Sequence, residues 1–319
     1  MTASLPNEVQ SVFEHYQTSE LTTVDAAGQP VTWPVMPYYV RGAPCVDVTT
    51  GLGYPKKADD ASANPLVALL FSDSTGCGLA DPPMVLVQGT AHVDDRDCTV
   101  NRERYAQESI QKLAGTAKRI APRPLRQMLS WYYSRIYIHV RPERVYVWPR
   151  GDGAAEPQLY DAHMEEVRSG HSEEPPRFHA TPVGGASTWD PRIAELGGRY
   201  RTAVLSLVSP DGFPFAIRLP VTVDEPNRRI RIEGAPTGVP FAPGLACLTA
   251  HAYANESDRE HNFQLRGDLV YADGAWALVP HQLVGGSELP PSQIAVLRAG
   301  VAMARRVRAT AKRELARRT

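Results

Sequence analysis

Cysteine is scarce in this chain of 319 residues, and neither sign of charge is in excess. The cysteines show no CxxC spacing, which predicts neither a zinc site nor a disulfide framework. We therefore expect reduced thiols and a cytoplasmic protein. The formal net charge is -1, so no long-range field favours a nucleic-acid partner, and we expect none. The four cysteines are Cys45, Cys77, Cys98 and Cys247.

Long apolar runs and common catalytic motifs are also missing. No segment approaches the roughly 18 consecutive apolar residues that cross a bilayer, so we expect no membrane partner. Residues 1–16 lack a basic region followed by an apolar core, so we expect no signal peptide. GxSxG, Walker, GxGxxG and HExxH motifs are absent, which leaves the enzyme classes built on them without support. The linker contains histidines and glutamates, but their spacing is not that of metal ligands, so we expect no metal site. These residues are His163, Glu165, Glu166 and His171.

Short apolar segments separated by turn residues dominate the first half of the chain. Residues 45–50 alternate with period two, residues 67–71 are continuously apolar, and residues 84–95 form a longer run of strand character. Many short strands with few helices are typical of a barrel. The sequence therefore predicts a mostly β fold with flanking helices.

The strand pattern of residues 21–148 occurs again in residues 204–285. Five strand segments recur in the same order, and turn or bulge residues fall at matching places, which indicates an internal duplication. We predict a first barrel in residues 1–150, a linker in 151–185, and a second, degenerate barrel in 186–319. The matched pairs are Gly28 and Gly212, Pro30 and Pro214, Gly89 and Gly267, and Pro142 and Pro280.

The last thirty residues predict a helix with one apolar face and a strongly basic opposite face. A basic helix can bind a membrane or nucleic acid. Because the whole chain is nearly neutral, a helix that docks on a barrel with its charged rim in solvent is the better interpretation.

Residues 49–70 read TTGLGYPKKADDASANPLVALL: a strand, two lysines, a short polar helix, Asn-Pro, and a new apolar strand. This stretch and its flanking strands resemble the split β-barrel of the pyridoxamine 5'-phosphate oxidase-like superfamily, which includes flavin- and deazaflavin-dependent reductases. The resemblance covers residues 5–149 and, more weakly, 199–286. It implies two tandem FMN-binding-type split barrels that form a pseudodimer within one chain.

In that family the basic pair binds the terminal phosphate of FMN, or its counterpart in the deazaflavin coenzyme. A lysine supplies charge-assisted hydrogen bonds, and the helix start adds free N–H donors. The resemblance also places the backbone of residues 33–36 along the ring edge. The alternative for the two lysines is a solvated surface without a ligand. The alternative for Trp33 is a place in the barrel core. The residues implied to bind the cofactor are Lys57, Lys56, Thr49, Thr50, Trp33, Val35, Met36, Tyr54 and Gln88.

The second unit has no lysine or arginine from residue 233 to residue 257, so we infer that it has lost its own phosphate site. Family members are usually homodimers with each cofactor between two barrels. The second barrel would then supply the opposite wall of one retained site, with Arg218, His261 and Arg266 as candidates. We expect either a monomer that acts as a pseudodimer or a homodimer.

The leading hypothesis is an oxidoreductase that uses FMN or a deazaflavin to transfer a hydride to or from a small organic substrate. The sequence identifies no catalytic residue, because the cofactor carries the chemistry in this family. The alternative is a non-catalytic flavin- or haem-binding split-barrel protein. A degenerate scaffold that acts through protein contacts is a third hypothesis.

Overall fold

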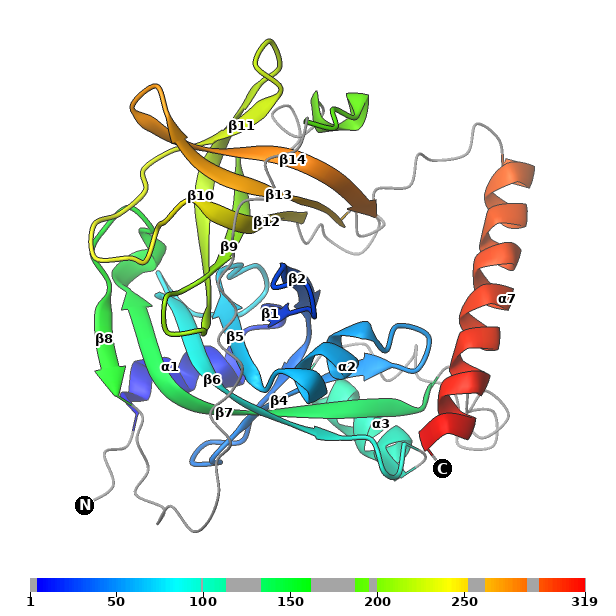
Figure 1. The fold of residues 1–319 in the computed structure, drawn as a ribbon. Coiled ribbons are helices and arrows are strands. Elements are labelled where there is room, and N and C mark those ends of the chain that lie inside the picture. The colour runs from blue at the N-terminus through cyan, green and yellow to red at the C-terminus, as the bar shows by residue number, and fades with distance from the viewer. Residues whose placement is uncertain are drawn as a thin grey trace.

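The computed structural model describes residues 5–98, 100–112, 133–161, 187–194, 200–251, 262–285 and 293–318. Two β-barrels lie one above the other in Figure 1, the first drawn in blue to green and the second in yellow to orange. His261 and the polar linker residues His163, Glu165, Glu166 and His171 lie outside the described residues.

The first barrel is one antiparallel sheet in the order β2-β1-β5-β6-β7-β4-β3. Met36 alone separates β2 from β3, which lie at the two ends of this path. The sheet therefore returns on itself, and the barrel is split at Met36. Its strands are β1 (Ser19–Val24), β2 (Pro30–Val35), β3 (Pro37–Tyr38), β4 (Val46–Gly51), β5 (Leu66–Phe71), β6 (Met84–Asp94) and β7 (Arg135–Trp148).

The second barrel is closed, in the order β10-β11-β14-β13-β12-β9. Its long strand β10 pairs with both β9 and β11, as β2 and β3 together pair with β1 and β4. The two barrels thus share one strand order, which confirms the mostly β fold and the duplication. The strands are β9 (Thr202–Val208), β10 (Pro214–Asp224), β11 (Arg229–Ile232), β12 (Gly244–His251), β13 (Asn262–Ala272) and β14 (Ala275–Gly285).

Each barrel has a bulge at the same place in its longest hairpin. Gly89 of β6 pairs with Pro142 of β7 at a register shift, and Gly267 of β13 pairs with Pro280 of β14 at another. A Cβ atom at Gly89 would lie 2.1 Å from the main-chain oxygen of Arg141, and one at Gly267 would lie 2.0 Å from the opposing carbonyl oxygen. Only glycine fits such an approach, so the matched glycines and prolines in the sequence mark one structural feature.

The two barrels share a buried interface. One apolar core includes Ala68, Leu70 and Leu86 of the first barrel together with Leu205 and Phe215 of the second. A second core lies inside the first barrel and includes α1 (Asn7–His15). Strands β5 and β6 therefore face the second barrel, and the duplication forms a pseudodimer within one chain.

Polar groups at this interface find partners across it. The Thr32 carbonyl oxygen accepts hydrogen bonds from Gln264 Nε2 at 2.6 Å and from Thr249 Oγ1 at 3.0 Å. The Thr32 hydroxyl lies 2.6 Å from Ser206 Oγ. Since unpaired buried polar groups are costly, these bonds fix how the barrels pack.

Four helices and three short elements complete the described residues. Strand β8 (Gln158–Asp161) lies within the segment expected to be a linker and pairs with β7. Helix α7 follows the second barrel in sequence, but Ala311 and Leu315 pack against the core of the first barrel. The remaining elements are α2 (Lys56–Ala63), α3 (Val100–Lys112), η2 (Pro149–Gly151), η3 (Pro191–Ile193) and α7 (Gln293–Arg318). In the described part of the chain, every helix is too short or too polar to cross a membrane.

Candidate functional site

Helix α2 lies against the first barrel, directly after the turn that ends β4. Ala58 and Ala61 are buried in the first core, so α2 presents one small apolar face to the barrel. Pro55 precedes its first residue, and Asn64 ends it in an extended conformation before Pro65. The first turn leaves main-chain N–H groups without intrahelical acceptors. Hydrogen-bond donors therefore gather where β4 meets α2.

Lys57 is the most unusual charge at this junction. Its Nζ lies 3.5 Å from Thr50 Oγ1, and no carboxylate pairs with it among the described residues. Burial and, to a smaller extent, the nearby positive charge of Arg135 together lower the pKa of Lys57 to about 8. The Thr50 hydroxyl donates to the Tyr54 carbonyl oxygen at 2.8 Å. An ammonium group that is partly withdrawn from water and has no anionic partner is costly, which favours an anion here.

Lys56 differs from its neighbour in both exposure and partners. Its side chain is 50% exposed, and Nζ lies 2.8 Å from Asp60 and 3.7 Å from Asp25. The pair with Asp60 spans one helical turn of α2. The structure thus separates the two lysines: only Lys57 carries a charge that lacks a carboxylate partner in the described part of the chain.

The two threonines of β4 are separated in the same way. Thr49 and Thr50 are consecutive in a strand, so their side chains point to opposite faces. Thr50 is buried and faces Lys57, whereas Thr49 pairs with Tyr137 on the other face of the strand pair. The structure therefore brings Thr50, but not Thr49, to the lysine.

Arg135 is a site residue that the sequence analysis missed. Strand pairing places it opposite Gly51, where a Cβ atom would lie 2.9 Å from Arg135 Nη1. Its guanidinium carbon lies 4.0 Å from the centre of the Tyr105 ring, a cation–π geometry. No motif marks Arg135, because only the register of β4 and β7 brings it to the junction.

The residues expected along the ring occupy varied environments. Val35 belongs to the first core, Trp33 is partly buried, and Met36 is the break between β2 and β3. Gln88 is buried, and its Nε2 donates to the Pro214 carbonyl oxygen of the second barrel at 2.8 Å. The Gln88 amide group thus links the barrels. Tyr54 is 54% exposed at the turn before α2.

Arg218, expected in the opposite wall, belongs to a buried network between the barrels. Its Nη2 lies 3.0 Å from Oε1 of the fully buried Glu20, and His251 Nε2 lies 2.7 Å from the same oxygen. Burial acts to raise the pKa of Glu20, but His251 and Arg218 outweigh it and hold that pKa below its ordinary value. Arg266, the other described candidate, donates to Gln264 Oε1 at 2.7 Å.

The corresponding junction in the second barrel has different chemistry. In the shared register, the position of Thr50 falls on Gly234, and residues 233–243 form an irregular loop where the first barrel has α2. A Cβ atom at Gly234 would lie 3.5 Å from Ala154 Cβ, and one at Gly238 would lie 3.3 Å from Glu156 Oε1. A carboxylate and a covering segment thus lie against this loop of the second barrel, and the hydroxyl of Thr50 has no counterpart at Gly234.

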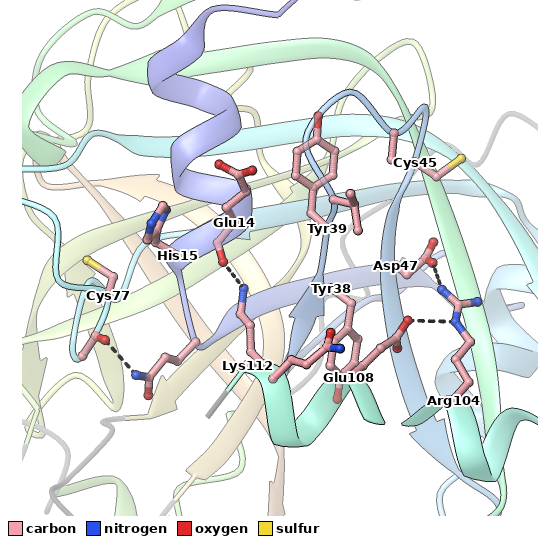
Figure 2. Close-up of a pocket in the computed structure, with 15 residues that line it drawn as sticks. Glu14, His15, Tyr38, Tyr39, Cys45, Asp47, Cys77, Arg104, Glu108 and Lys112 are labelled. Carbon is pink, nitrogen blue, oxygen red and sulfur yellow. Dashed lines mark hydrogen bonds and ion pairs between the residues drawn. The ribbon is translucent and has the colours of Figure 1, made fainter. Parts of the chain in front are cut away.

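A second polar region is a cavity of about 560 Å³ between α1, β4 and α3 (Figure 2). Arg104 Nε lies 2.8 Å from Glu108, and Arg104 also pairs with Asp47. Asp47 accepts a hydrogen bond from His139 that raises the pKa of the imidazole. Lys112 Nζ donates to the Glu14 carbonyl oxygen at 2.7 Å, at the end of α1. These charges satisfy one another, which indicates a structural network.

The described residues contain no cluster of three or more metal-ligating side chains. No protein-family model matches the chain, and no curated protein does.

Several solved structures are similar to part of this chain. General stress protein 26 from Bacillus anthracis is 19% identical, with a TM-score of 0.33 over 48% of this chain and 95% of its own. A putative pyridoxamine 5'-phosphate oxidase from Listeria innocua is 17% identical, with a TM-score of 0.31 over 44% of this chain and 95% of its own. An F420 reductase is 18% identical, with a TM-score of 0.32 over 44% and 98%.

Proposed function

We propose that this chain binds one phosphate-bearing flavin coenzyme, FMN or a deazaflavin, and acts as an oxidoreductase on a small organic substrate. The observation that carries the proposal is Lys57: a partly buried ammonium group that no carboxylate of the described residues neutralises. The Thr50 hydroxyl and the first turn of α2 lie beside it.

A phosphate fits these residues better than a neutral ligand does. The burial that lowers the pKa of Lys57 is offset when an anion is placed beside the ammonium group. Charge-assisted hydrogen bonds from Nζ and from main-chain N–H groups at the start of α2 would hold phosphate oxygens. Arg135 adds positive charge from the neighbouring strand. Lys56 has its own carboxylates, so Lys57 is the proposed ligand.

When bound, the flavin ring supplies the hydride transfer. The chain would contribute position and electrostatics: Lys57 would hold the phosphate end, with Thr50 orienting its ammonium group. The partly buried β2 segment that includes Trp33 would lie along the ring. Because both barrels belong to one chain, the site needs no second copy, and we propose a monomeric pseudodimer. All four cysteines are free thiols, in keeping with a cytoplasmic protein.

An absorption spectrum of the purified protein tests this proposal. We expect the near-visible bands of a flavin or a deazaflavin, either as isolated or after incubation with FMN and with a deazaflavin coenzyme in turn. A Soret band would instead show a haem protein, and no binding of either coenzyme would contradict the proposal.

A further inference from the structure

We infer that helix α7 is a positioning element for the proposed phosphate site, holding in place the turn and the helix that carry its ligands. This inference rests on the proposed function. In Figure 1, α7 stands beside α2 and the first barrel, on the side of the molecule where β4 ends. Its C-terminal half, from Val307 to Arg318, contacts both parts of the junction, the turn of residues 51–54 and α2.

The contact with the turn is unusually close. A Cβ atom at Gly53 would lie 2.4 Å from Val307 Cγ1, 3.4 Å from Val307 Cβ and 3.5 Å from the Val307 main-chain oxygen. Any side chain at position 53 would therefore push α7 away. Gly53 is two residues from Gly51, which pairs with Arg135, and one residue from Tyr54, whose carbonyl oxygen holds the Thr50 hydroxyl.

An apolar stripe on α7 continues this contact. Ala311, one helical turn after Val307, is fully buried, and Leu315 packs against the same core. That core also contains Ala58 and Leu52, which flank Lys57 and the turn. The spacing of four residues places the three α7 side chains on one helix face. Docking of α7 thus completes the core beneath the junction.

Arginines at the end of α7 hold α2 directly. Arg317 Nη2 lies 2.8 Å from Asp59, and Arg318 Nη2 lies 2.5 Å from the same carboxylate in the first turn of α2. Arg318, whose side chain is 5% exposed, also pairs with Asp95 at the end of β6. One buried guanidinium group therefore ties α2 to the barrel wall, two residues from Lys57.

Docking of α7 and binding of the phosphate both depend on the same ordered turn and on α2. The two are therefore coupled, and the coupling is reciprocal. Undocking α7 should weaken phosphate binding, and bound cofactor should hold α7 in place by the same factor. Couplings of this kind amount to about 5- to 150-fold in affinity.

The sharpest test is a pair of matched substitutions on α7. Ala311→Glu places a charge in the core and should undock the helix, whereas Ala309→Glu adds the same charge at an exposed position. We expect cofactor affinity to fall about 5- to 150-fold for Ala311→Glu and to stay unchanged for Ala309→Glu. The melting temperature of each variant without cofactor shows whether the barrels remain folded.

A compensating pair keeps the test valid if Ala311→Glu does not fold. Gly53→Ala should lower affinity by displacing Val307, and the double variant Gly53→Ala/Val307→Ala should restore it, since the clashing methyl group is gone. In the parent, amide exchange in residues 305–318 should slow when cofactor binds. Full affinity in Gly53→Ala or Ala311→Glu would overturn the inference, whereas failure of the parent to bind cofactor would overturn the proposed function instead.

Discussion

Thr50 and Gly234 occupy the same position in the two barrels. Val46 pairs with Val140, two residues before the bulge partner Pro142. In the second barrel Ile230 pairs with Leu278, which is likewise two residues before the bulge partner Pro280. Four residues further along the chain lies Thr50 in one copy and Gly234, two residues past the end of β11, in the other. The first barrel has a hydroxyl beside a partly buried lysine, whereas the second has a glycine beneath a covering segment, which is why we propose a single phosphate site.

The two adjacent lysines are predicted to differ. Lys57→Ala removes a charge-assisted contact worth about 1.5–3 kcal/mol. Cofactor affinity should therefore fall by a factor of about ten to over a hundred. Lys56→Ala removes a half-exposed lysine already paired with Asp60 and should change affinity little. Titration of both variants with the same cofactor checks this, with melting temperatures as the control for folding. Equal losses of cofactor affinity for the two variants would show that neither lysine is a specific phosphate ligand.

Cofactor affinity should also depend on pH through Lys57. Burial lowers the pKa of Lys57 to about 8 in the free protein, and a bound phosphate raises it again. The protonated form is the one that binds, so affinity should fall as pH rises above about 8, by up to about tenfold per pH unit. Titrations from pH 7 to pH 10 measure the effect. Lys57→Ala should abolish this fall, and a fall that persists in the variant would assign it to another group.

Glu20 is predicted to hold the two barrels together. Glu20→Ala leaves Arg218 and His251 buried without their carboxylate and should cost about 3–5 kcal/mol of the free energy of unfolding. Glu14→Ala, which removes the exposed pair with Arg41, should cost no more than about 1 kcal/mol. Urea unfolding of both variants measures the difference. Similar losses would show that the inter-barrel network contributes no more than a surface pair.

The same carboxylate should make the chain sensitive to acid. The folded-state pKa of Glu20 lies below its ordinary value, so the folded protein binds fewer protons at Glu20 than the unfolded chain does. Its contribution is therefore complete above the ordinary glutamate range and is lost as pH falls through the lowered folded-state pKa. Urea midpoints measured from pH 7 to pH 3 should fall less steeply in Glu20→Gln than in the parent. Parallel curves would exclude Glu20 as the titrating group.

The two bulge glycines should be equally intolerant of a side chain. Gly89→Ala and Gly267→Ala each place a methyl group about 2 Å from a main-chain oxygen, and each should cost about 3 kcal/mol of stability, the upper end of the usual range for overpacking. Gly274→Ala is the control: its Cβ would meet no atom within 4 Å, and only the left-handed φ of +74° is unfavourable, at about 1–2 kcal/mol. Thermal unfolding ranks the three. A loss at Gly89 no larger than at Gly274 would contradict the shared bulge.

The barrels were predictable from the sequence because their determinants are local or repeated. Alternation along the strands, the Gly-Pro turns and the bulge pair Gly89 and Gly267 are visible in one dimension. Their recurrence in a fixed order indicated the duplication before any strand was paired, and the strand order of both barrels confirms it.

The composition of the site was only partly predictable. The sequence analysis gave both lysines the same role, although one signal for separating them is present: Asp60 lies four residues after Lys56, the spacing of a helical ion pair. Arg135 left no such signal, because it reaches Gly51 only through the register of β4 and β7. The docking of α7 on the first barrel depends on contacts such as Gly53 with Val307, which are more than two hundred residues apart.

The stoichiometry of cofactor binding tests the single retained phosphate site most directly. Calorimetric titration of the cofactor-free chain with whichever coenzyme the absorption spectrum identifies should give about one equivalent per chain. The reason is that Lys57 and Thr50 have no counterpart beside Gly234 and Glu156. Two equivalent sites per chain would contradict the proposed asymmetry between the barrels.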